Sequence, residues 1–91
     1  MNIRAEITKT FEDKGALLAS AAIIFDERFI VKNLRVINGA NGLFVAMPSF
    51  KGRNDRYIDN CFPLDNETRE EIQQLVLDAY EASEDSDKYS T

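Results

Sequence analysis

The 91-residue sequence contains no histidine and no tryptophan, and it has a single cysteine, Cys61. Histidine is the commonest general base, a frequent zinc ligand and the usual activator of serine and cysteine nucleophiles. One cysteine cannot form an intrachain disulfide, and beside Phe62 it is expected to be a buried structural residue. We therefore expect a protein that is not an enzyme and that needs no metal or other cofactor.

Long apolar segments are also absent, since the longest run, residues 16–25, has only ten residues. A helix needs roughly 18 or more apolar residues to span a bilayer. Residues 1–6 are interrupted by charge and lack the layout of a signal peptide. We therefore expect a cytoplasmic protein without membrane insertion. A chain of this length forms one domain that buries about 60–65% of its unfolded surface, so dimerisation would add stability.

The net charge of −5 is unevenly distributed along the chain. Residues 65–91 carry nine acidic and two basic side chains, a net of −7, whereas residues 1–64 carry seven acidic and nine basic ones, a net of +2. The acidic average argues against a nucleic-acid-binding protein, but binding depends on the local field rather than on the sum. The first 64 residues therefore stay a candidate for contact with an anionic partner.

Hydrophobic periodicity predicts antiparallel strands in the first part of the chain. Residues 2–9 alternate between apolar and polar side chains, and residues 16–25 are typical of a strand buried on both faces, although a buried helix has the same pattern. Residues 29–37 are rich in β-branched side chains, and their imperfect alternation indicates a bulge. Polar residues at 12–15 and 26–28 predict the two turns between these strands.

Residues 36–48 are the most informative stretch. Two Asn-Gly steps lie between apolar segments and predict a tight reversal, because asparagine and glycine tolerate positive φ. Pro48 lacks the N–H that a ladder requires, so it ends the strand that begins at Leu43. A basic segment follows at residues 49–56, which we expect to be an exposed, mobile loop, and residues 57–62 are a candidate fifth strand.

After Pro63 the pattern changes to that of an amphipathic helix. Asp65 or Asn66 is the expected N-cap, and the acidic residues of the first turns suit the positive end of the helix dipole better than a metal cluster. The apolar stripe consists of Ile72, Leu75, Val76, Ala79 and Tyr80.

The helix is expected to fade by Ser83, leaving residues 84–91 as a disordered acidic tail. Residues 1–83 are then one α+β domain, in which an antiparallel sheet of four or five strands carries the C-terminal helix on one face.

With these elements in place, the sequence resembles the SpoVG family (stage V sporulation protein G) of bacterial septation regulators. The likeness lies in residues 29–37, in the block Asn-Gly-Leu-Phe-Val-Ala-Met-Pro-Ser at 41–49, and in residues 57–80, so it covers roughly residues 3–82. The resemblance implies a homodimer that binds DNA, and in some members RNA, and that acts in gene regulation, septum formation and sporulation. No small-molecule substrate is implied.

The family's basic residues after the Met-Pro-Ser block are implicated in nucleic-acid binding. Carried onto this chain, they predict contacts from Lys51, Arg53 and Arg56, and Arg69 in the first helical turn is a fourth candidate. Family members often place Lys-Arg directly after the serine, whereas Phe50 follows the serine here. In addition, Glu70 and Glu71 stand where family members frequently have a basic residue. Both departures reduce the positive charge of the predicted binding surface.

Two interpretations stay open for the aromatic residues and for the function. Phe50 and Tyr57 flank the basic segment and are able to stack on bases, but the simpler interpretation is that they anchor the segment in the core. The alternative function is a protein–protein interaction module of the cell-division or signalling machinery, in which an edge strand or the acidic helix face captures a partner.

Overall fold

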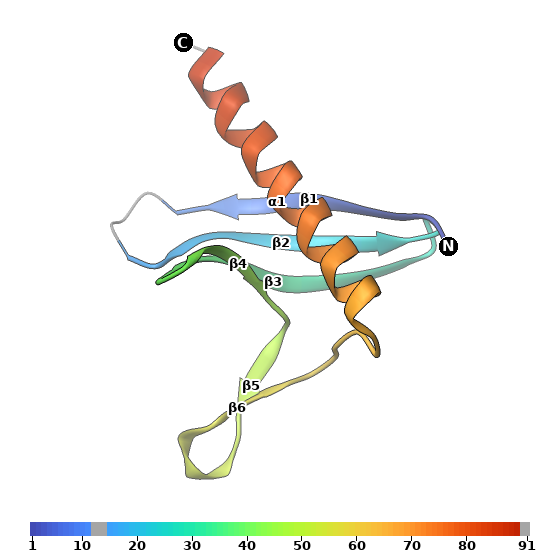
Figure 1. The fold of residues 1–91 in the computed structure, drawn as a ribbon, viewed down its shortest axis with the longest axis vertical. Coiled ribbons are helices and arrows are strands. Elements are labelled where there is room, and N and C mark those ends of the chain that lie inside the picture. Colours follow the sequence, from blue (N-terminus) through green and yellow to red (C-terminus); the bar gives the residue numbers. More distant parts are fainter. Residues whose placement is uncertain (12–14, 90–91) are drawn as a thin grey trace.

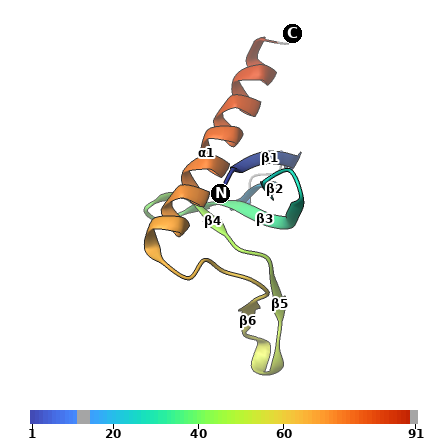
Figure 2. The same ribbon diagram turned by 90° about the vertical axis from the view of Figure 1, so that its right-hand side faces the viewer.

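The computed structural model describes residues 1–11 and 15–89. Four antiparallel strands form the main sheet in the order β1-β2-β3-β4, and two short strands, β5 and β6, form a second sheet. One long helix, α1, crosses a face of the main sheet (Figures 1 and 2), which confirms the α+β architecture. The elements are β1 (Ile3–Thr10), β2 (Leu17–Phe25), β3 (Phe29–Gly39), β4 (Gly42–Ala46), β5 (Ser49–Lys51), the 3₁₀ turn η1 (Arg53–Asp55), β6 (Tyr57–Asp59) and α1 (Asn66–Tyr89).

The reversals between the main strands come from residues that accept left-handed backbone. Asp26 and Glu27 have φ of 54° and 55°, and the Arg28 N–H donates to the Phe25 carbonyl at 2.9 Å, as in a tight turn whose two central residues are left-handed. The predicted turn at 26–28 is thus confirmed. Of the turn predicted at 12–15, residues 12–14 lie outside the described residues. The strands on either side of it, β1 and β2, pair antiparallel as expected.

The two Asn-Gly steps have different structural roles. Gly39 pairs with Gly42 across the β3–β4 turn, and of these two only Gly42 has a positive φ, 116°. A Cβ at Gly39 would lie 2.8 Å from the Phe44 ring, so this glycine permits a close side-chain approach. The predicted reversal is confirmed, and the second Asn-Gly step provides its left-handed residue.

The bulge predicted in residues 29–37 is also present. Ala21 pairs with Leu34 and Ile23 pairs with Val31, so two residues of β3 lie opposite one residue of β2. Asn33, within this bulge, has a φ of 69°. Strand β2 is buried at four consecutive positions, Ala21 to Ile24, as expected for a central strand.

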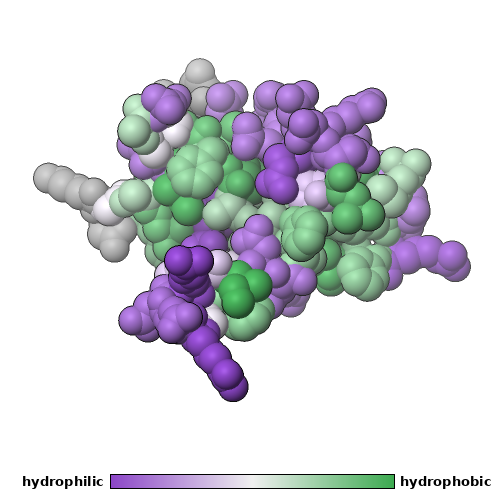
Figure 3. Space-filling model, turned by 60° about the horizontal axis from the view of Figure 1, so that its bottom comes forward, coloured by the Kyte–Doolittle hydropathy of each residue, from purple (hydrophilic) through white to green (hydrophobic). Residues whose placement is uncertain are grey.

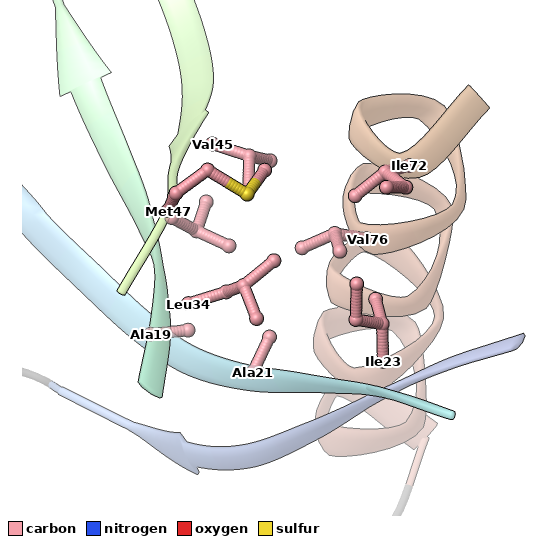
Figure 4. Packing of buried hydrophobic residues seen from close by; sticks show 9 residues of the cluster. Ala19, Ala21, Ile23, Leu34, Val45, Met47, Ile72 and Val76 are labelled. Atoms are coloured by element: carbon pink, nitrogen blue, oxygen red, sulfur yellow. The ribbon is translucent and has the colours of Figure 1, made fainter. Parts of the chain in front are cut away.

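The main core lies between α1 and the sheet (Figure 4). Val76 of α1 is fully buried, and so are Leu34 and Val36 of β3. Small side chains at Ala19 and Ala21 of β2 leave room for the helix to approach. Burying an aliphatic side chain of this size contributes about 1.5–3 kcal/mol, and the cluster is completed by Ile23, Val45, Met47 and Ile72.

Two expectations about strands and loops are met only in part. Residues 49–56 are largely exposed as expected, but they are not a loop throughout, because they contain β5 and η1. The predicted fifth strand forms β6 over Tyr57–Asp59, but it pairs with β5 and not with the main sheet. The physical reason is Pro48, which cannot donate to a ladder, so the chain leaves the main sheet and pairs again beyond it.

The helix begins as predicted but ends later. The Thr68 N–H donates to Asp65 Oδ1 at 2.6 Å, which makes Asp65 the N-cap. The expected end at Ser83 is wrong, because α1 continues to Tyr89 and its last turns extend past the sheet (Figure 1). No glycine or proline follows Pro63, so no strong helix breaker interrupts it. Within the described residues, no helix combines the length and apolar character needed to cross a membrane.

The N-cap makes helix stability depend on pH. Hydrogen bonds from the Thr68 N–H and hydroxyl hold the pKa of Asp65 below its ordinary value. Because the folded pKa is lowered, this stabilisation is present above the ordinary aspartate pKa of about 3.9 and is lost as the pH falls below it. Asp65→Asn keeps a cap acceptor but cannot titrate, so we expect the melting temperatures of the wild type and variant to converge between neutral and strongly acidic pH. A constant difference would contradict the assignment.

Candidate functional site

The β5–β6 hairpin projects from the main sheet as an arm (Figures 1 and 2). A backbone hydrogen bond from the Asn60 N–H to the Pro48 carbonyl, 2.7 Å long, closes its base. Near its tip, the Gly52 N–H donates to the Arg56 carbonyl at 2.8 Å. No residue of β5, η1 or β6 is buried, so the arm presents its side chains to solvent and to partners.

Three of the four predicted contact residues lie together on this arm. Lys51 belongs to β5, Arg53 to η1, and Arg56 follows η1 directly. Lys51 Nζ lies 3.4 Å from Asp55 Oδ1, and both side chains are largely exposed. Exposed pairs of this kind are weak and easily displaced. Among the side chains that the structure describes, those of residues 1–11 and 15–83, no carboxylate lies within ion-pair distance of either arginine.

Arg69 occupies a different place. It lies in the first turn of α1, where its N–H donates to the Asp65 carbonyl at 3.2 Å. Figures 1 and 2 show that this end of the helix lies apart from the tip of the hairpin in both views. The structure therefore groups Lys51, Arg53 and Arg56, and it does not place Arg69 among them.

The aromatic residues of the arm are exposed, so the expectation that they anchor this segment in the core is wrong. Phe50 is 49% exposed and Tyr57 is 69% exposed. Phe50 pairs with Ile58, and Lys51 pairs with Tyr57. Because directly paired residues share a face of an antiparallel ladder, Phe50 lies on one face of the arm, while Lys51 and Tyr57 lie on the other.

Arg35 of β3 is a site residue that the sequence reasoning did not identify. Its Nη2 donates to Ser49 Oγ at 2.9 Å and to the Met47 carbonyl at 3.4 Å, so it ties the base of the arm to the main sheet. Beside it lies a polar pocket of about 310 Å³. The available signal was a charged residue inside a largely apolar strand, but only the fold brings it to Ser49.

An open apolar groove of about 430 Å³ lies between the start of α1, the segment before it and the adjacent ends of β2 and β3. Cys61 lines the groove and is only partly buried, whereas the sequence predicted a buried cysteine. Three nearby side chains are strongly exposed: Phe29 at 66%, Phe62 at 59% and Leu64 at 93%. Figure 3, which brings the hairpin end of the molecule forward, shows hydrophobic surface beside the hydrophilic surface there.

Comparison with known proteins agrees with this architecture. The SpoVG family model matches residues 1–82, which include every strand and most of α1. A protein of Lachnospira eligens named "Putative septation protein SpoVG" is 38% identical over 84 residues, which cover 92% of this chain and 96% of that protein.

Two further relatives show the same similarity. A Clostridium perfringens protein of the same name is 40% identical over 81 residues, with 89% of this chain and 90% of that protein covered. A Listeria monocytogenes protein named "Putative septation protein SpoVG 2" is 47% identical over 70 residues, 77% of this chain and 69% of that protein. The chain therefore belongs to the SpoVG family.

Proposed function

We propose that this protein is a cytoplasmic, homodimeric regulator that binds DNA, and also RNA, through the β5–β6 arm. Its role would be in gene regulation linked to septation and sporulation, in keeping with the names of its relatives. The observation that carries the proposal is the cluster of Lys51, Arg53 and Arg56, whose side chains are exposed on a projecting hairpin that contains no buried residue. Such a hairpin delivers cations to phosphates without disturbing the core.

The net charge of the arm determines how strongly one copy of the protein is able to bind phosphates. Besides its three cations, the arm carries two acids, Asp55 and Asp59, so one arm has only a small net positive charge. A second copy of the arm doubles the number of cations, and a two-fold axis fixes the spacing between the two clusters. Phosphate contacts then supply most of the affinity and position the protein, while sequence readout is limited.

The proposal is tested by fluorescence anisotropy of labelled double-stranded DNA and single-stranded RNA over a range of salt concentrations. If six arm cations contact phosphates, the log–log slope of affinity against salt is roughly −5 for a duplex and −4 for a single strand. No binding at low salt, or binding that is independent of salt, would contradict the proposal. Either result would point to the alternative, a protein–protein interaction module.

The homodimer has a candidate interface in the apolar groove and its exposed neighbours. A two-fold interface uses the same patch on both copies, and here a groove and a projecting apolar side chain, Leu64, lie on one patch. Contiguous apolar surface of this kind on a small soluble domain marks an interaction site. A second copy of this chain is the occupant that accounts for both features, because its Leu64 would enter the groove of the first copy and the Leu64 of the first copy would enter its groove.

Leu64→Asp is expected to convert the dimer to a monomer, because it places a carboxylate in the apolar interface. The monomer fold should persist, since Leu64 is 93% exposed and contributes little to the core. Light scattering measures the mass, and circular dichroism checks the fold. Leu43→Asp, at an exposed position in the β3–β4 hairpin, is the matched control and should stay dimeric. A dimeric Leu64→Asp variant would place the interface elsewhere.

A further inference from the structure

The polar pocket at the base of the arm has the features of a ligand site. Ser20 and Arg35 are cross-strand partners, and their neighbours Ala21 and Leu34 belong to the core under α1. The pocket therefore lies on the face of the sheet that α1 leaves uncovered. Its volume of about 310 Å³ is at the lower end of the range of about 300–1,000 Å³ that small ligands occupy.

Arg35 offers a fixed guanidinium to this pocket. Both of its hydrogen bonds use Nη2, one to Ser49 Oγ and one to the Met47 carbonyl. Across the part of the chain that the structure describes, no carboxylate lies within ion-pair distance of Arg35, and Nε and Nη1 have no acceptor. A planar guanidinium held by one nitrogen presents its other donors in the geometry that suits a phosphate.

The other side chains that line the pocket have the hydrogen-bonding and stacking groups that a nucleobase requires. Asn33 and Asn60 line the pocket, and each carboxamide has both donors and an acceptor for the edge of a base. Tyr57 also lines it, and this residue is 69% exposed. A ring this accessible is available for stacking, and it shares its face of the arm with Lys51.

We propose that this pocket holds one unstacked nucleotide of a single-stranded nucleic acid. The base stacks on Tyr57, its edge bonds to Asn33 and Asn60, and a phosphate bonds to Arg35. The proposal rests on the function proposed above and specifies its substrate class. A base in a duplex must leave its stack to enter such a pocket, so a single strand binds more tightly than a duplex at the same salt concentration.

The test compares a fluorescein-labelled oligouridylate with a labelled DNA duplex of equal length. Tyr57→Ala is expected to weaken single-strand binding about tenfold, the size of one lost stacking contact, and to leave duplex binding unchanged. Tyr57→Phe retains the ring and should bind nearly as the wild type does. Phe50→Ala is the matched control, because it removes an exposed aromatic from the opposite face of the same arm.

A second variant examines the guanidinium. Arg35→Lys keeps the charge but loses the planar fork, so single-strand affinity should fall more than duplex affinity, while circular dichroism confirms the fold. If Tyr57→Ala and Arg35→Lys both bind the oligouridylate as the wild type does, the pocket proposal is overturned and the proposed function stands. Equal weakening towards both probes also overturns it. A wild type that binds neither probe overturns both proposals.

Discussion

Replacing Lys51, Arg53 and Arg56 together by alanine is expected to abolish salt-dependent nucleic-acid binding. Each cation that neutralises a phosphate releases counterions, and proteins with 6–10 such contacts lose about 10³–10⁵ in affinity between about 50 and 200 mM salt. Removing three cations from each copy of the proposed dimer should therefore weaken binding at low salt by at least about 100-fold. The three residues belong to an arm without buried side chains, so the fold should be unaffected.

Two controls separate the site from the total charge. Lys9, Arg28 and Lys32 are exposed cations outside the arm, and their triple alanine variant changes the net charge by the same amount. It should retain most of the binding. Asp55→Asn removes the acid that lies 3.4 Å from Lys51, and it should bind more tightly than the wild type. Equal losses in both triple variants would show that the arm is not the site.

Leu34→Ala is expected to lower the free energy of unfolding by about 2–5 kcal/mol, as truncations of fully buried leucines do. Leu34 has no exposed surface and lies in the cluster with Val76 of α1 and Ala21 of β2. Small domains have a total stability of about 5–15 kcal/mol, so this one change removes a large share. The cavity lies directly beneath the helix, and the sheet cannot close it without moving α1.

Urea-induced unfolding, followed by circular dichroism, measures this loss. The wild type and variant must be compared at one protein concentration, because the proposed dimerisation would add to the apparent stability. Leu43→Ala, which is already 38% exposed in the wild type, is the matched control and should lose far less. If Leu34→Ala were as stable as the wild type, the packing of α1 on the sheet would be wrong.

The sequence was sufficient for the features that depend on local chemistry. Alternation in residues 2–9 and β-branched side chains in residues 29–37 predict strands because side-chain spacing follows backbone geometry. The Asn41-Gly42 step and the Asp65 N-cap are local as well, since each involves hydrogen bonds or backbone angles within a few residues. The basic residues were also identified from the sequence, through the resemblance of the Met-Pro-Ser block.

The boundaries of α1 show where local reasoning weakens. The apolar stripe ends near Tyr80, and beyond it the sequence is acidic and polar, which led to an expected end at Ser83. Because no glycine or proline follows Pro63, the helix is able to continue to Tyr89. Hydrophobic periodicity does not indicate this continuation, because the last turns carry no apolar stripe. Hydrophobic periodicity therefore predicted which face of α1 packs on the sheet better than it predicted the length of α1.

By itself, the sequence determined the α+β class, the turns between the main strands, the start of the helix at Asp65 or Asn66 and the basic character of residues 51–56. Only the tertiary structure decided that β5 and β6 leave the main sheet as an arm, that Phe50 and Tyr57 are exposed, and that Arg35 meets Ser49. These features depend on pairing and register between residues far apart in the chain. Such contacts follow from how the whole backbone packs around one core, which no short window of sequence encodes.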